Sequence, residues 1–170
     1  MTRTVAEKRA TFRAMHNSGC FVLPNPWDAG SALYLQTLGF QAIATTSSGF
    51  AWSVGHADNT LPCDAVLEHL RDIVNATDLP VNADFENGFG RDPAGVAESV
   101  RLAVDTGVAG LSIEDSAGDA AAPLFPIDVA VERLSAARRA IDETGGDTLL
   151  TGRPENFFVG ARDLVTRSRV

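Results

Sequence analysis

The sequence predicts an α/β protein in which successive βα units build a parallel sheet. Two architectures fit this order: a (β/α)8 barrel of the TIM-barrel type and a doubly wound open sheet. Short apolar runs rich in β-branched residues alternate with segments of helical spacing along the 170 residues. Helix start and stop signals separate the runs. No linker, charge block or repeat divides the chain, so we expect residues 1–170 to form one domain.

The apolar runs define five expected strands, at residues 20–25, 41–47, 79–86, 109–116 and 147–153. Asp28 can cap a helix after the first run, and segment 62–76 places its apolar side chains on one stripe. Asp92 followed by Pro93 is typical of a helix start, and glycines end the helix expected at 128–146. The charged N-terminal segment is also helix-like.

The loop after the first run favours the barrel, because "NPWDAGSA" lacks the G-x-G-x-x-G pattern of a dinucleotide-binding sheet. A complete barrel takes about 250 residues and eight strands, so we expect only about the first five βα units in this chain. The remaining alternative is a flavodoxin-like domain with strand order 2-1-3-4-5. An incomplete barrel would expose an edge and an apolar inner face, which favours a homo-oligomer, either dimer or tetramer.

Composition argues against several classes of protein. The net charge is -8 and basic clusters are missing, so we expect no nucleic-acid partner. The sequence contains neither an apolar run long enough to span a membrane nor a signal peptide, so we expect no membrane partner and a cytoplasmic location. Cys20 and Cys63 have no close spacing, which argues against a disulfide framework or a cysteine zinc site.

Carboxylates follow three of the expected strands. Asp84 and Glu86 lie in "VNADFENGFG", Glu114 and Asp115 end the next strand, and Asp58 lies in the loop after the second strand. Loops that follow parallel strands meet on one face, so these acids are expected to converge and repel one another. Any one of them could be a helix cap or an arginine partner, but the group indicates a hard divalent cation, Mg²⁺ or in its place Mn²⁺.

Arg153 follows the fifth strand and could bind a substrate carboxylate in bidentate fashion, or else pair with Glu155 or with one of the acids. Ser47, Ser48 and Gly49 follow the second strand, where backbone N–H groups could receive an anion, although such turns are often only turns. The three histidines show no metal-ligand spacing. We expect His69 at the surface of its helix and a second histidine, at position 56, in a solvated loop.

Five segments resemble the isocitrate lyase and phosphoenolpyruvate mutase superfamily in order: "PNPWDAGSA", "TTSSGFAWSVGHAD", "VNADFENGFG", "GLSIEDS" and "TGRPENF". The resemblance implies a (β/α)8 barrel, usually tetrameric, with Mg²⁺ and a small anionic α-oxo or α-hydroxy acid as substrate. The superfamily's D-x-D-x-G-[YF]-G metal motif corresponds to residues 84–90, with Glu86 in place of the second Asp. The resemblance further implies Asp84, Glu86 and Glu114 as metal ligands, Asp58 as an acidic partner, and Ser47, Ser48, Gly49 and Arg153 as substrate-binding residues.

Two departures limit what the resemblance implies. The K-[KR]-C-G-H loop of isocitrate and methylisocitrate lyases is replaced here by "EDSAGDAAAPLFPIDVA", and the Lys-Thr-Asn-Ser run of the mutase is also unmatched. The sequence therefore predicts a lyase, hydrolase or mutase that breaks a C–C or C–P bond through a metal-stabilised enolate. Arg153 and Asp58 are the predicted catalytic residues, and the general acid and base are not identified. The alternative is a truncated, inert homologue that acts as a structural or ligand-binding oligomer.

Overall fold

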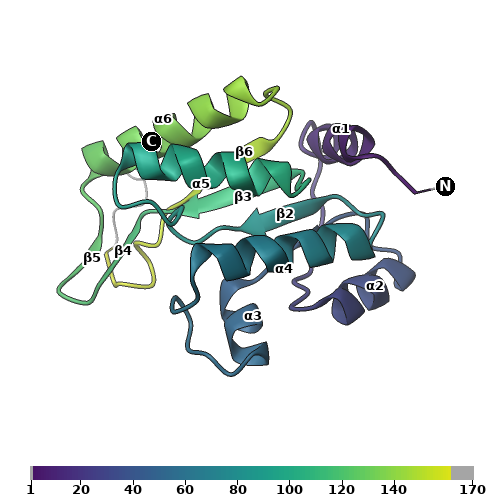
Figure 1. Ribbon diagram of the computed structural model, residues 1–170, viewed down its shortest axis with the longest axis horizontal. Coiled ribbons are helices and arrows are strands. Elements are labelled where there is room, and N and C mark those ends of the chain that lie inside the picture. The colour runs from purple at the N-terminus through teal and green to yellow at the C-terminus, as the bar shows by residue number, and fades with distance from the viewer. Residues whose placement is uncertain (1, 162–170) are drawn as a thin grey trace.

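A parallel four-stranded sheet forms the centre of the molecule in the computed structural model, which describes residues 2–161 (Figure 1). Its strands are β1 (Ile43–Ala44), β2 (Val81–Asp84), β3 (Gly110–Glu114) and β6 (Leu149–Arg153), and they are neighbours in that order. All three pairings are parallel. The predicted α/β class is therefore confirmed. The flavodoxin-like order is excluded, because β1 and β2, which correspond to the second and third expected strands, pair directly with each other.

Six helices accompany the sheet in the described residues. They are α1 (Val5–Met15), α2 (Ala29–Thr37), α3 (Ser47–Ser53), α4 (Cys63–Ala76), α5 (Pro93–Asp105) and α6 (Ile127–Glu143). Asp28 and Asp92 cap α2 and α5 as predicted, and each carboxylate accepts a hydrogen bond from the backbone N–H three residues later. The rest of the predicted domain, Met1 and residues 162–170, lies outside the described residues.

The two faces of the sheet differ in polarity because successive side chains of a strand point to opposite sides. Val81, Ala83, Leu111 and Ile113 belong to the main hydrophobic core, together with apolar side chains of α4, α5 and α6. The alternate positions carry polar side chains: Asn82, Asp84, Ser112, Glu114, Thr151 and Arg153. The expectation of an apolar inner face was therefore wrong, since much of that face lines a polar cavity.

Helix α1 packs at the amino-terminal end of the strands, opposite the carboxyl ends that hold the candidate site (Figure 1). Lys8 Nζ donates to the carbonyls of Val74 and Thr77, and Arg9 donates to those of Val104 and Val108. Both cations are buried, and their hydrogen bonds satisfy carbonyls at the ends of α4 and α5. Thus α1 closes one end of the sheet.

Residues 20–25 do not form the first expected strand. The segment lies beside β1 with one backbone hydrogen bond, from Ala44 N to Pro24 O at 3.1 Å. Pro24 and Pro26 have no N–H group, so the segment cannot donate a regular ladder of hydrogen bonds to its neighbour. Beyond β3, the chain forms an antiparallel hairpin of β4 (Ser116–Asp119) and β5 (Ala122–Leu124), which the sequence analysis did not predict.

His69 is buried rather than at the surface, which corrects the sequence-based expectation. Its ring stacks on Phe50 of α3 with the centroids 3.8 Å apart. Burial lowers the pKa of His69 to about 4. His56 is exposed, as expected, and both cysteines are free thiols. Among the described residues, no helix is long and apolar enough to cross a membrane.

Candidate active site

A cavity of about 750 Å³ opens at the carboxyl ends of the strands. Its wall includes Asp84 of β2, Glu114 of β3 and Arg153 of β6, each of which ends its strand with the side chain on the inner face. The ends of three adjacent parallel strands therefore place two carboxylates and one guanidinium in the wall of the same cavity. In parallel βα folds, this end of the sheet holds the active site.

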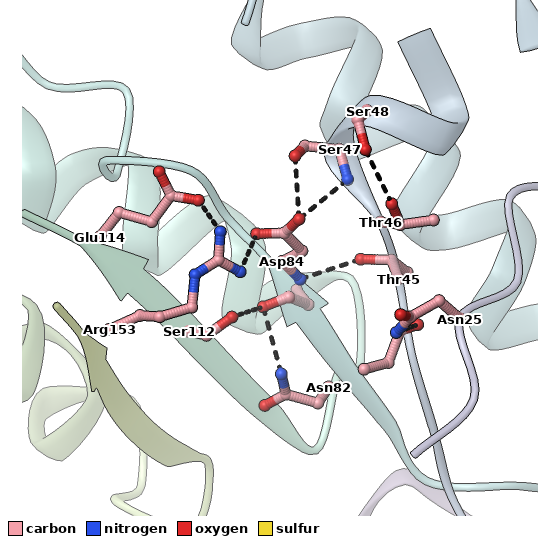
Figure 2. A network of polar contacts seen from close by, with 12 residues as sticks. Asn25, Thr45, Thr46, Ser47, Ser48, Asn82, Asp84, Ser112, Glu114 and Arg153 are labelled. Atoms are coloured by element: carbon pink, nitrogen blue, oxygen red, sulfur yellow. Dashed lines mark hydrogen bonds and ion pairs between the residues drawn. The ribbon is translucent and has the colours of Figure 1, made fainter. Parts of the chain in front are cut away.

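Arg153 binds both acids (Figure 2). Its Nη1 atom donates to Asp84 Oδ1 at 3.0 Å, and its Nη2 atom donates to Glu114. The Nε atom donates to Glu155 Oε1 at 2.8 Å. These contacts match the alternative interpretation of Arg153, in which it pairs with Glu155 or with one of the acids, while substrate binding by Arg153 stays a prediction. The Arg153 side chain remains 40% exposed to solvent. One guanidinium compensates three carboxylates here, which leaves an excess of negative charge.

Residues of the segment that follows β1 hold Asp84 in place (Figure 2). Its Oδ2 atom accepts hydrogen bonds from the N–H and the hydroxyl of Ser47, both at 2.9 Å. Its own backbone N–H donates to Thr45 Oγ1 at 2.9 Å. These bonds fix the carboxylate, whose side chain is only 11% exposed, in one orientation.

The predicted anion-binding turn is the first turn of α3. Thr46 caps this helix by accepting a hydrogen bond from Gly49 N, and its hydroxyl lies 3.3 Å from that of Ser48. Ser47 and Ser48 line the cavity, but Gly49 is not part of its wall. The N–H groups of Ser47 and Gly49 are already bonded to Asp84 and Thr46, so the structure uses them within the protein.

Glu86 lies apart from the cavity wall, because the chain leaves the strand at Asp84. Its backbone has φ 44°, in the left-handed region, and its side chain is buried. Burial raises the pKa of Glu86 to about 7, and the nearby charges of Asp84 and Asp58 add to this effect. Asp58 itself is exposed and lines the cavity. In the described residues, no three acidic, histidine or cysteine side chains are grouped closely enough to form a ready metal site.

The site also contains residues that the sequence motifs do not indicate. Asn82 and Ser112 line the cavity two positions before Asp84 and Glu114, so the alternation of strand residues could have revealed them. Thr45 contacts Asp84 through its side-chain oxygen. No motif marks Thr45, because its contact depends on how the loop folds back over the strand end. Glu155, by contrast, was named in the sequence as a possible partner of Arg153, and it accepts a hydrogen bond from that side chain.

These features define a protein of the parallel α/β barrel class with an acidic, arginine-containing site at the carboxyl ends of its strands. Residues 12–169 match the family model for phosphoenolpyruvate phosphomutase. The chain belongs to this family, which confirms the resemblance drawn from the sequence motifs.

Known relatives include lyases and a hydrolase. The chain is 33% identical over 144 residues to 2-methylisocitrate lyase of Escherichia coli K12, covering 80% of this chain and 48% of that enzyme. A solved structure from Burkholderia cenocepacia J2315 with a lyase/mutase designation shares 48% identity and a TM-score of 0.91, over 94% of this chain and 58% of that one. Phosphonopyruvate hydrolase, solved with oxalate and Mg²⁺, shares 25% identity and a TM-score of 0.81, over 95% of this chain and 55% of that one. The chain thus spans about half the length of these relatives.

Proposed function

We propose that the protein is a magnesium-dependent lyase, hydrolase or mutase that acts on a small α-oxo or α-hydroxy carboxylic acid. The observation that carries this proposal is the unit of Asp84, Arg153 and Glu114 in the wall of the cavity. It combines hard oxygen donors with a partly exposed cation that can bind a carboxylate. The relatives support the substrate class, since they include 2-methylisocitrate lyase and a phosphonopyruvate hydrolase solved with oxalate and Mg²⁺.

The donor chemistry of the site fits Mg²⁺. The candidate ligands Asp84, Glu86 and Glu114 offer only oxygen atoms, and the pKa of Glu86 is raised first by burial and then by the negative charges of Asp84 and Asp58. The group is not preassembled, because Arg153 lies between Asp84 and Glu114. A bound Mg²⁺ would supply positive charge to stabilise the negative charge that develops when the bond next to the oxo group breaks. Mn²⁺ has similar preferences and could replace it.

The chain's own residues would bind and orient the substrate. The three nitrogen atoms of Arg153 each donate to a carboxylate of the protein. Arg153 must therefore release one of these acids before two of its N–H groups can bind a substrate carboxylate. Ser47 would keep Asp84 fixed during this exchange, and the hydroxyl of Ser48 lies in the same wall. Asp58, exposed at the cavity, is the second proposed catalytic residue beside Arg153.

The segment that carries the lyase cysteine loop in relatives forms the β4–β5 hairpin here. Ser116, at the start of β4, lines the cavity. The hairpin contains no cysteine, histidine or lysine that could donate a proton in the way the lyase motif does. This difference favours a reaction other than isocitrate cleavage.

Binding of oxalate, a planar α-oxo acid mimic, tests the proposed function. We expect Mg²⁺ to raise the melting temperature, and oxalate to raise it further only when Mg²⁺ is present, because ligands that bind the folded state stabilise it. Calorimetry should then give an affinity for each. A melting temperature that neither Mg²⁺ nor oxalate changes would refute the proposal.

An inert, ligand-binding homologue is the second candidate. It is favoured by the missing preassembled metal group among the described residues and by the triple pairing of Arg153. In this case oxalate should bind with equal affinity with and without Mg²⁺. Turnover of oxaloacetate, assayed with Mg²⁺ present, distinguishes this candidate from the enzyme.

We also propose that the protein self-associates, and we retain the cytoplasmic location as a prediction. Several large side chains are exposed: Trp27 by 49%, Tyr34 by 64% and Trp52 by 68%. Exposed apolar groups of this size are typical of interfaces when they are contiguous. Light scattering after size-exclusion chromatography should show a dimer or tetramer, and a monomer at micromolar concentration would refute the proposal.

A further inference from the structure

The loop between β2 and α5 has an unusual backbone that other elements hold in place. Glu86 and Phe89 have positive φ values of 44° and 57°, in the left-handed region that non-glycine residues rarely adopt. This conformation is strained for a residue with a side chain, so the loop persists only when the surrounding structure determines it. Because Glu86 is one of the proposed metal ligands, whatever holds this loop also sets the position of its carboxylate.

Arg133 of α6 is the side chain that reaches this loop from outside. Its Nη2 atom donates to the carbonyls of Asn87 at 2.8 Å and Gly90 at 2.9 Å, and its Nη1 atom makes a long contact of 3.5 Å to the carbonyl of Arg91. The central carbon of the guanidinium, Cζ, lies over the ring of Phe125, 4.3 Å from its centroid. The geometry is that of a clamp across both ends of the loop.

Burial makes this clamp costly. Arg133 is 2% exposed, and burial lowers its pKa despite the favourable charge of Asp92. Its Nε atom is buried with no hydrogen-bond partner among the described residues. A buried cation bound to backbone carbonyls is a weak means of adding stability, since its desolvation offsets much of what the contacts contribute. Its contacts instead point to a role in fixing the loop.

Other contacts complete the hold on the loop. Glu114 N donates to Glu86 O at 2.8 Å, and the hydroxyl of Ser99 donates to the carbonyl of Gly88. The loop carbonyls are therefore bound from β3, α5 and α6. Of these contacts, only those of Arg133 come from a side chain of α6, and they bind carbonyls on both sides of Gly88 and Phe89.

We propose that Arg133 is a positioning residue, which fixes residues 86–91 so that the Glu86 carboxylate stays near Asp84 in the acidic group assigned to the metal. This inference rests on the proposed function, because it requires that Glu86 contribute to Mg²⁺ binding. Arg133 does not line the cavity that contains Asp84, although it lines a neighbouring cavity with Glu114 and Arg153. Its hydrogen bonds act on the site through the loop backbone.

The test compares the Mg²⁺ affinity of Arg133→Met and Arg133→Lys with that of Arg139→Met. Arg139 lies exposed on the same helix, so this control removes the same charge without touching the loop. Substitutions that disturb the support of metal ligands typically weaken binding about tenfold to a hundredfold. We expect calorimetry to show such a loss for Arg133→Met, a smaller loss for Arg133→Lys, and none for the control.

A second measurement separates positioning from a general loss of stability. In a Glu86→Gln background, Arg133→Met should reduce Mg²⁺ affinity no further, because the two changes act on the same group. Hydrogen exchange should also become faster in a peptide spanning residues 85–92, and not in one from α4. An affinity loss of equal size in the Glu86→Gln background, or unchanged exchange in the loop, would overturn the positioning role.

The outcomes for the proposed function and for Arg133 are distinct. If the wild-type protein binds no Mg²⁺, the proposed function fails and the role of Arg133 fails with it. If the wild type and all three variants bind Mg²⁺ with equal affinity, only the role of Arg133 is refuted. Should Arg133→Met fail to fold, Arg133→Lys, which retains the charge, provides the same comparison.

Discussion

Glu114 and Arg153 occupy paired positions on adjacent parallel strands, and the guanidinium binds the carboxylate across the pair. The same guanidinium reaches Asp84 on the strand beyond, with 3.0 Å between Nη1 and Oδ1. One cation therefore links the carboxyl ends of β2, β3 and β6. Arg153 acts as an internal counter-ion in this arrangement, and it must exchange partners if it is to bind a substrate carboxylate.

Replacing Arg153 tests this exchange. We expect Arg153→Met to weaken oxalate binding in saturating Mg²⁺ by about tenfold to a hundredfold, because a hydrogen bond to a charged group contributes about 1.5–3 kcal/mol. The oxalate affinity of Arg153→Lys should lie between those of the wild type and Arg153→Met, since an ammonium keeps the charge but cannot bind a carboxylate in bidentate fashion. Arg101→Met removes an exposed ion pair with Glu143 and is the control. Equal oxalate affinity in all variants, measured by calorimetry, would contradict the assignment.

Asp84 is the acid that we expect to matter most for the metal. Asp84→Asn keeps the size of the side chain and an oxygen that Ser47 can bond, but it removes the negative charge. We expect Mg²⁺ affinity to fall by more than about tenfold, the lower range seen when only a supporting residue is lost. Asp105→Asn, exposed at the end of α5, is the matched control. The idea fails if the two variants bind Mg²⁺ alike.

The convergence of Asp84, Glu114 and Arg153 could be predicted from the sequence because all three end parallel strands, whose carboxyl ends meet at one edge of the sheet. The position of Glu86 could not be predicted in this way. Its spacing of two from Asp84 predicts a shared face only if the strand continues. Strand β2 ends at Asp84, and Glu86 itself has a left-handed backbone that changes the direction of the chain. A turn of this kind depends on contacts with α5 and α6 that no local pattern reveals.

Other differences have equally specific causes. The burial of His69 was missed because α3, the short helix that carries its stacking partner Phe50, was read as a turn. The first expected strand failed because Pro24 and Pro26 interrupt its hydrogen bonding. The cause lies in a neighbouring helix in the case of His69, and in the prolines within and just after the segment in the case of the strand.

Gly90 tests the packing of the loop against α5. A Cβ atom at this position would lie 2.1 Å from the backbone nitrogen of Val96, so Gly90→Ala forces the loop and the helix apart. We expect a loss of about 2–3 kcal/mol in unfolding free energy, measured by urea denaturation. Gly30→Ala, in the first turn of α2 with an ordinary 3.5 Å contact to Asp28, should be neutral or stabilising. Similar urea midpoints for Gly90→Ala and Gly30→Ala would show that the loop can move away from α5 at little cost in stability.

The last prediction concerns the pH dependence of stability, to which Glu86 and His69 contribute with opposite sign. The folded state raises the pKa of Glu86 from 4.5 to about 7, so its contribution to stability is full below pH 4.5 and is lost as the pH rises through 7. The folded state lowers the pKa of His69 from 6.5 to about 4, so its contribution is full above pH 6.5 and is lost as the pH falls through 4. Over the shared window, the two effects oppose each other.

Single substitutions should reveal each effect. In urea denaturation with a chelator present, the unfolding free energy of Glu86→Gln relative to wild type should increase by about 1–3 kcal/mol from pH 4.5 to 7. That of His69→Phe, which keeps the stacked ring, should instead increase by a similar amount as the pH falls from 6.5 to 4. The double variant should show the sum, since the buried Nε2 atom of His69 has no hydrogen-bond partner among the described residues. A Glu86→Gln curve parallel to that of the wild type would mean that the carboxyl is solvated in the folded protein, and the charge crowding inferred for the site would then be absent.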